Sequence, residues 1–393
     1  MAFVSAKEQI AIGGYGTAIG GTITPANLHQ VAVDGGSFSA TENIDQILDQ
    51  GRRGSELMDY RSFAGIKSTE LSFDFPMMYG NATGTAGNAG GTFGILLRNI
   101  LGAGTAANNA TDSLRQTQVG STSTYTNYFR LGGSKEYIAV GRKLFSTGTS
   151  DAIYGGARVT ELTLSGNAGE GFVTCSTTLM GKSHAYSDLS GVTFKTDSIS
   201  NDIAQGWQNS EVSTYPQKIV GTTVTNIISF EVTLSREATP LYTTGNSQDY
   251  SDIYLGPLEV TFNIVADIPT QPTSGGSTLI NQFRENTQGV TQLAVSHTSA
   301  TGSGSASGER TRFLVLGMVN STLLESPIEI DTSGTYATVS VSGRALANIN
   351  PTTGAIVNPQ PSAQAYSTNN MNLTPIEVAL REVGNTTTAP TYL

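Results

Sequence analysis

The sequence is poor in the residues that most often carry out chemistry. It holds one cysteine, three histidines and one tryptophan in 393 residues. The single Cys175 excludes an internal disulfide and a cysteine metal cluster within one chain, so we expect it to be a small buried hydrophobe. The histidines His29, His184 and His297 lie far apart, and none stands in an HxxxH or HExxH spacing. No GxSxG, P-loop or CxxC motif occurs, so we predict no enzyme, no cofactor and no metal site.

Charge and long apolar runs are also scarce. Charged residues make up 13% of the chain and the formal net charge is −10, which argues against a general nucleic-acid-binding surface. The most apolar run covers residues 92–102, is interrupted by Arg98, and is far too short to span a bilayer. No targeting segment is visible at the N-terminus. We therefore expect a protein that is made in a cytoplasm and has no membrane partner.

The residues that are abundant favour sheets and turns. Glycine occurs 45 times, and threonine, serine and valine are common. Residues 67–75 alternate between polar and apolar side chains, which is typical of a strand with one face in a core. A loop rich in glycine, alanine and asparagine follows, and residues 92–102 are then predicted to form a short helix between Thr92 and Gly102.

The same order of strand, flexible loop and short helix recurs later, in residues 258–285. A long-period internal repeat decides an architecture, and this one predicts two copies of one small domain. The fold class is therefore mainly β, with two tandem β-sandwich or barrel-like domains, each with one short flanking α-helix. The expected boundaries are an irregular N-terminal arm at 1–27, a first domain at 28–184, a bridge at 185–222, a second domain at 223–348 and a C-terminal extension at 349–393.

Each predicted domain contains a long charged loop between its first two strands, at residues 41–62 and 235–256. Long loops of mixed charge are either solvated and mobile, or they dock a partner whose charges fix the register. Acidic pairs such as Asp45 with Asp49 could hold a cation, but they lack the ligand density of a calcium loop. If the loops dock, the residues that we expect to make the contacts are Arg52, Arg53, Glu56, Asp59, Arg236, Glu237, Asp249 and Asp252.

Several short segments resemble the tail tube proteins, or major tail proteins, of long-tailed, non-contractile bacteriophages. The likeness covers roughly residues 28–348. The segments that carry it are Arg53-Gly54 and Asp59, Gly65-Ile66-Lys67 before Leu71-Ser72-Phe73, Ile100-Leu101-Gly102, residues 156–164, and residues 171–176 with Gly181-Lys182. The insertions at 81–91 and 103–127 and the segment after 348 exceed the compact pattern of that family.

The resemblance implies a structural virion protein whose domains form rings of six that stack into a hollow tube for genome delivery. A chain with two tandem domains needs only three copies per ring, which gives a pseudo-sixfold homotrimer. The two charged loops are then the ring-stacking elements, and the acidic balance makes a lumen through which double-stranded DNA passes without specific binding. The implied partners are further copies of the chain and the tape-measure, tail terminator and baseplate or tip proteins. The implied location is the phage tail, assembled in the host bacterial cytoplasm.

Two other functions suit a duplicated sandwich that is rich in threonine, serine and glycine. A glycan- or surface-binding adhesin would carry clustered exposed aromatic residues or a calcium site, and it usually has an export signal. A capsid decoration protein would not polymerise alone. The single tryptophan and the lack of a visible signal favour the tube interpretation over the adhesin.

Overall fold

A computed structural model gives the architecture of most of the chain. It describes residues 8–16, 23–50, 59, 61–79, 91–102, 114–119, 124–133, 135–144, 151–169, 171–182, 185–186, 189–196, 215–224, 226–245, 248–267, 276–298, 311–325, 330–331, 338–350, 352–355 and 373–383. Within these residues the protein is mainly β, with a large antiparallel sheet and two short α-helices, which confirms the mainly β part of the predicted fold class.

The strands follow the predicted alternation of apolar and polar residues. In β4 (Arg61–Pro76) the side chains of Leu71, Phe73 and Phe75 are buried, and β9 (Val173–Gly181) alternates between buried and partly exposed positions along its whole length. Cys175 is one of the buried positions of β9, as expected for a small hydrophobe. Because successive side chains of a strand point to opposite faces, each of these strands places one face in the core and leaves the other face outside it.

Two sets of elements have the same order of pairing. In the first set β3 pairs with β4, β4 with β9, β9 with β8, and β8 with β7. In the second set β13 pairs with β16, β16 with β20, β20 with β18, and β18 with β17. The first set consists of β3 (Ser39–Asp49), β4, α1 (Gly91–Leu101), β7 (Tyr137–Lys143), β8 (Ala152–Asn167) and β9. The second consists of β13 (Ile227–Ser235), β16 (Glu259–Asp267), α2 (Gly276–Arg284), β17 (Gly289–Thr298), β18 (Thr311–Leu323) and β20 (Thr338–Leu346).

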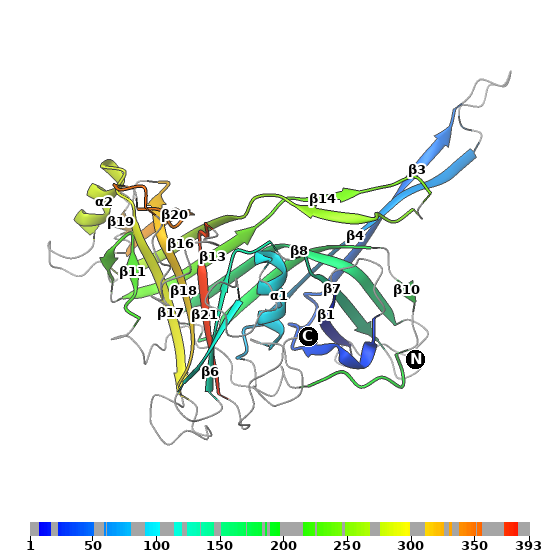
Figure 1. Ribbon diagram of the computed structural model, residues 1–393, viewed down its shortest axis with the longest axis horizontal. Helices are drawn as coiled ribbons and strands as arrows, with labels where there is room; N and C mark the ends of the chain where they lie inside the picture. Colours follow the sequence, from blue (N-terminus) through cyan, green and yellow to red (C-terminus); the bar gives the residue numbers. More distant parts are fainter. Residues whose placement is uncertain are drawn as a thin grey trace.

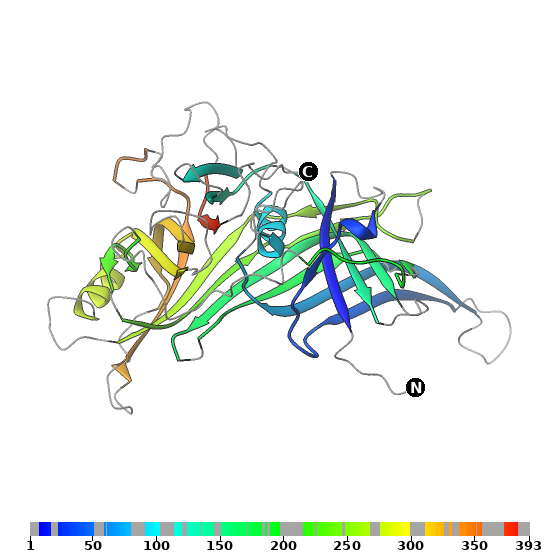
Figure 2. The ribbon, with the colours of Figure 1, turned by 90° about the horizontal axis from the view of Figure 1, so that it is seen from below.

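The two sets join into one sheet through β8 and β13. These strands are antiparallel, and their register runs from Asn167 opposite Ser229 to Glu161 opposite Ser235. Thr163 and Thr233 lie opposite each other at this joint, with their hydroxyl oxygens 3.0 Å apart. The resulting sheet has the order β3-β4-β9-β8-β13-β16-β20. It extends along the long axis of the molecule, with β3 at one end and β20 towards the other (Figures 1 and 2).

The N-terminal residues belong to the first set, which corrects the expected irregular arm. Residues of β1 (Gln9–Gly16) pair with β7 on one side and with β2 (His29–Val31) on the other. The short helical turn η2 (Pro25–Asn27) comes just before β2 in the chain. Ile10, Ala11 and Ile12 are buried there. The apolar alternation of this segment is short and lies among glycines, so its burial depends on β7, which follows much later in the chain. The first half of β8 pairs with β7 and with β10 (Ala185–Tyr186).

The stretch 103–127, predicted as an insertion after the helix, contains strands that the sequence pattern did not indicate. Its described residues form β5 (Leu114–Val119) and the start of β6 (Thr124–Arg130), which pair as a hairpin. β21 (Glu377–Val383) lies within the predicted C-terminal extension, and it pairs with β6 on one side and with β18 on the other. The C-terminal strand therefore links a hairpin from the first part of the chain to the second set. The small strands β11 (Lys218–Ile219), β12 (Thr222–Thr223) and β19 (Ile330–Asp331) complete the second part.

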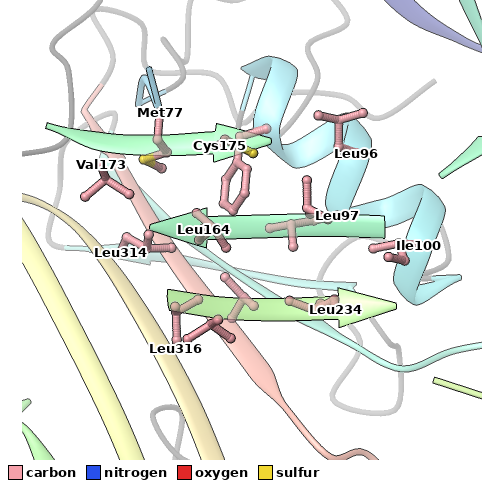
Figure 3. Close-up of a cluster of buried hydrophobic side chains, with 14 of the residues drawn as sticks. Met77, Leu96, Leu97, Ile100, Leu164, Val173, Cys175, Leu234, Leu314 and Leu316 are labelled. Atoms are coloured by element: carbon pink, nitrogen blue, oxygen red, sulfur yellow. The ribbon is translucent and has the colours of Figure 1, made fainter. Parts of the chain in front are cut away.

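Helix α1 covers the middle of the long sheet. All eleven of its residues are buried, including the polar residues Thr92, Arg98 and Asn99. Figure 3 shows Leu97 and Ile100 of α1 close to Cys175 of β9, Leu164 of β8 and Leu234 of β13. The helix thus packs across the joint between the two sets, and a single hydrophobic cluster contains residues of both.

The polar residues of α1 are held by specific contacts. Arg98 donates two hydrogen bonds to the Glu136 carboxylate, at 2.6 and 2.7 Å, and Asn99 bridges the backbone of Glu136 and Val159. The helix ends as predicted, because Gly102 has a φ of +63° that favours glycine. It begins differently, since Thr92 is the second residue of the helix and not a cap before it.

Candidate assembly surfaces

A long hairpin extends from the first set. β3 and β4 stay paired from Ser39 opposite Ser72 to Asp49 opposite Arg61, so most of the described residues of the expected loop at 41–62 are strand. We define the first arm as residues 44–50, 59 and 61–66 of this hairpin. Figures 1 and 2 show the two strands running out beyond the remaining sheets. The prediction of a loop failed here because charged, polar and apolar residues are mixed along both strands, and an arm that projects into solvent has no buried face to produce a regular hydrophobic alternation.

The first arm carries an unusual share of exposed apolar side chains. Half of the ten exposed large hydrophobic residues in the described part of the chain lie on it. Ile47 and Phe63 are opposite each other in the register, and they are 58% and 51% exposed. Ile44 and Leu48 lie on the other face of β3, which follows from the alternation of the strand. Large contiguous apolar surface of this kind marks an interaction site in soluble proteins.

A second arm projects from the second set in the corresponding place. It consists of residues 238–245 and 248–255, in which β14 (Ala238–Leu241) pairs with β15 (Asp252–Leu255). Arg236 anchors its base, because its guanidinium donates to the carbonyl oxygens of Gly256 at 2.7 Å and Ile100 at 3.0 Å. Burial lowers the pKa of Arg236 from its usual value, and the nearby cationic Arg158 lowers it further.

The two arms touch each other. The backbone N–H of Lys67 in β4 donates to the carbonyl oxygen of Gln248, and the Gln248 side chain donates to the carbonyl oxygen of Ala64, at 3.0 and 2.8 Å. The Tyr242 hydroxyl donates to the Lys67 carbonyl oxygen at 3.2 Å. Burial raises the pKa of the Tyr242 phenol, and the carboxylates of Asp45 and Asp249 raise it further. Contacts between segments so far apart in sequence hold the two arms on one side of the molecule (Figure 1).

A polar cluster fastens the second arm to the first set. Asp252 accepts hydrogen bonds from the Tyr137 hydroxyl and from the Lys135 ammonium, the latter at 3.0 Å. Burial alone would raise the pKa of Asp252, but these donors and the Ile253 N–H outweigh it and hold the pKa below its usual value. The pKa of Tyr137 is raised, first by burial and then by its hydrogen bond to Asp252. The neutral phenol is therefore the donor in this pair.

The structure places the predicted contact residues in different roles. Arg52, Arg53 and Glu56 lie outside the described residues. Asp59 is exposed and accepts a hydrogen bond from the Gln50 side chain at 2.8 Å. Glu237 is exposed, while its carbonyl oxygen accepts from the Gly256 N–H.

Three further predicted contact residues lie in the second arm or at its base. Arg236 and Asp252 hold the base of the second arm, so they are internal supports. The backbone of Asp249 forms an isolated parallel β-bridge with that of Lys67 in β4, next to the first arm.

The apolar residues of the first arm were not among the contacts predicted from the sequence, which were the charged residues of 41–62. A signal was present, because large aliphatic and aromatic residues in a segment that is otherwise strongly charged have no reason to be there unless a partner covers them. Those residues are Ile44, Ile47, Leu48, Phe63 and Ile66.

The outward face of the long sheet is the second candidate surface. In the strands β4, β9, β8, β13, β16 and β20, the buried positions face the core and the alternate positions form a face rich in serine, threonine and asparagine. Six carboxylates and one guanidinium lie at the positions of this face, a difference of five negative charges. They are Glu70, Asp74, Glu161, Glu231, Glu259 and Asp267, with Arg344.

Hydrogen bonds and an ion pair organise this face from one end to the other. Ser176 donates to Asp74 at 2.5 Å, the Thr163 and Thr233 hydroxyls meet at the joint, and Arg344 lies 3.2 Å from Glu259. A groove of about 500 Å³ lies between this face and residues 235–238, which connect β13 to the second arm. Glu70, Glu161 and Glu237 are among the residues that line it. The side chains around it are mostly hydroxyls and carboxylates, without an aromatic platform for a sugar or a base.

The described residues provide no group of three histidine, cysteine, aspartate or glutamate side chains that could hold a metal ion. His29 lies in β2 and His297 in β17, in different parts of the fold, whereas His184 lies outside the described residues. In the part of the chain that the structure describes, neither helix is long and apolar enough to cross a membrane. The sequence matches no protein-family model and no curated protein.

Proposed function

We propose that this chain is a tail tube protein of a long-tailed, non-contractile bacteriophage, and that three copies close a ring that stacks into a hollow tube. One observation carries the proposal. Two sets of strands with the same pairing order continue each other in one sheet through β8 and β13, so one chain already supplies two consecutive segments of a repeating wall. A sheet built from repeating units can close on itself without exposed edges, which is how barrels avoid edge-to-edge aggregation.

In this proposal the two sets are tandem tube domains, each with one flanking helix. Their cores lie within the predicted ranges 28–184 and 223–348. Residues of the predicted N-terminal arm, bridge and C-terminal extension add strands to these domains. Three chains then supply six similar domains per ring, so a ring with exact threefold symmetry has approximate sixfold symmetry.

The outward face of the long sheet suits the inner wall of such a tube. Its hydroxyl and amide side chains offer few apolar contacts, and its excess of carboxylates repels the phosphates of DNA. Protein that attracts DNA does so mainly through lysine and arginine contacts with phosphate, and this face has only Arg344. Double-stranded DNA could therefore slide along the wall without specific binding.

The arms suit contacts between stacked rings. The first arm exposes apolar side chains on both of its faces, so a neighbour that receives it would bury both. The second arm holds the first one in place, because the Gln248 side chain and the Tyr242 hydroxyl donate hydrogen bonds to the backbone of β4. This arrangement assigns docking to apolar contacts on the first arm, with Asp59, Asp249 and the charges of residues 52–56 in a supporting role. The tape-measure, tail terminator and baseplate or tip proteins would meet the ends of the stack.

Negative-stain electron microscopy of the purified protein, concentrated and incubated for several days, tests the proposal. Hollow tubes with a regular stack of rings, and three chains per ring by mass measurement, are the expected result. Monomers that stay monomeric at every concentration, together with binding in a glycan array, would overturn the tube and favour an adhesin. Binding to preformed phage capsids without tube formation would instead favour a decoration protein.

A further inference from the structure

The long sheet ends in two strands that have one partner each. Among the described residues, β3 pairs only with β4, and β19 pairs only with β20. These strands lie at opposite ends of the long axis of the molecule, as Figures 1 and 2 show for β3 and for the neighbouring β20. A strand with an open edge offers a row of backbone donors and acceptors to another strand.

The internal joint between β8 and β13 shows how two such edges meet. The registers of the two sets can be superimposed on a similar sequence, because Gly181-Lys182 at the end of β9 matches Gly343-Arg344 in β20. This match places Leu179 opposite Leu71 on Val341 opposite Ile264. Carried one strand further in each direction, the same superposition matches Ile44 of β3 with Leu234 of β13, and Ile330 of β19 with Leu162 of β8. β3 is thus the counterpart of β13, and β19 is the counterpart of the joining part of β8.

Burial supports this correspondence. Leu234 is fully buried at the internal joint, where it lies opposite Leu162. Its counterpart Ile44 is 44% exposed, although the two residues occupy the same place in their sets. The position of Ile44 is therefore fully buried in the second set and exposed in the first. An exposed isoleucine at such a position is expected if the β19 edge of another molecule covers it.

We propose that β19 of one copy pairs antiparallel with β3 of the next copy, in the register of the internal β8–β13 joint. In this register Ile330 lies opposite Ile44 of the neighbouring copy, and Asp331 lies opposite Asn43. The joint is head-to-tail and uses two different surfaces, so it closes into a ring if the rotation allows it. This inference rests on the proposed function for the number of copies in the ring, but the pairing itself follows from the two registers.

Engineered disulfides test the pairing. Adjacent residue pairs of an antiparallel ladder alternate between a wide and a close type, so one of the pairs Ile44/Ile330 and Asn43/Asp331 is of the close type. We would make I44C/I330C and N43C/D331C, oxidise the concentrated protein, and separate the products on a non-reducing denaturing gel. The native Cys175 is buried, and burial raises its thiol pKa well above the usual value, so it should not interfere.

The expected result is a ladder of covalent dimer and trimer from at least one double variant, with little material above the trimer. The four single-cysteine variants should give no ladder. T41C/D331C, which shifts the register by two residues, should give several-fold less product, because cross-linking needs the two Cβ atoms to approach closely.

The outcomes separate this inference from the proposed function. Tubes seen by electron microscopy without a ladder from either double variant would overturn the joint and leave the tube protein proposal standing. A ladder without tubes would support the joint and count against the tube. Equal products from the in-register and shifted variants would also overturn the joint, because they would indicate random contacts between chains.

Discussion

Single side chains fix the places where distant parts of the chain meet. The clearest case is the ion pair of Arg130 in β6 with Glu377 in β21, whose side chains are 6% and 0% exposed. A buried charge that loses its partner is strongly destabilising, whereas replacing both partners by apolar residues is often close to neutral. We therefore predict that Arg130→Met alone lowers the free energy of unfolding by about 3–5 kcal/mol.

The double variant R130M/E377L should recover most of that loss, as measured by urea denaturation followed by circular dichroism. A matched control is the pair Arg344 and Glu259, whose side chains are 46% and 47% exposed. Removing that pair should change the free energy of unfolding by at most about 1 kcal/mol. Equal costs for the buried and the exposed pair would contradict the assignment of Arg130 and Glu377 to the core.

The Asp252 carboxylate makes the attachment of the second arm depend on pH. Its pKa in the folded protein lies below the usual value of 3.8, so the folded state binds the proton less readily than the unfolded state does. A lowered pKa contributes stability that is fully present above the unfolded pKa and is lost as the pH falls through the folded pKa. We predict that Asp252→Asn destabilises the protein at neutral pH and that this difference shrinks below about pH 4.

Urea denaturation of the wild type and of Asp252→Asn at a series of pH values measures this effect. Glu237→Gln is the control, because its carboxylate is exposed next to the same arm, and it should change stability little at any pH. A difference between wild type and Asp252→Asn that stays constant down to about pH 2.5 would show that the charge of Asp252 does not matter.

At the scale of elements, the first arm is the feature that a monomer does not need. Its apolar side chains are exposed in the free chain, so replacing them should not reduce monomer stability. We predict that I47S/F63S leaves the thermal unfolding midpoint within a few degrees of the wild type and abolishes higher assemblies in sedimentation velocity. Assembly that persists in this variant would mean that the arm does not dock.

A control for this variant is L324S, which changes an exposed leucine outside the arms. It should assemble like the wild type. Loss of assembly in L324S as well would indicate a general effect of surface polarity and would remove the support for a specific role of the arm.

The elements that could be predicted from the sequence are those whose pattern is local. The alternation of Leu71, Phe73 and Phe75 predicted β4, and the apolar run ending at Gly102 predicted α1, because burial on one face or on all sides leaves a direct trace. Arm strand β3 lies almost entirely in the segment that was predicted to be a loop, since no core lies against most of its length. The polar strand β5 was missed for the same reason, because its residues are ordered by pairing with β6 rather than by a buried face of their own.

The candidate surfaces could be predicted only in part. The charged segments around Asp59 and Asp249 were predicted as two long loops, whereas the structure forms paired strands in both segments and brings the two arms together. The internal roles of Arg236 and Asp252 could not be foreseen, since their partners Ile100 and Tyr137 lie more than a hundred residues away in sequence. The acidic sheet face also depends on pairings between the two sets, which no local pattern specifies.

At the scale of the whole molecule, three features bind the two sets into one unit. The ladder between β8 and β13 joins their sheets, α1 packs across that joint, and β21 is paired on one side with β6 and on the other with β18. Interfaces between independent domains are usually smaller and more polar than a shared core. The two sets should therefore not unfold separately.

We predict a single cooperative transition in calorimetry of the monomer, with equal calorimetric and van't Hoff enthalpies. Leu164→Ala in the first set and Val341→Ala in the second remove buried side chains, and changes of this kind cost about 1–5 kcal/mol each. In a single unit each variant lowers the midpoint of the one transition and does not split it. If one variant instead produced two separated peaks, with only one of them shifted, the sets would be independent domains, and the continuous wall proposed for the tube would lose its physical basis.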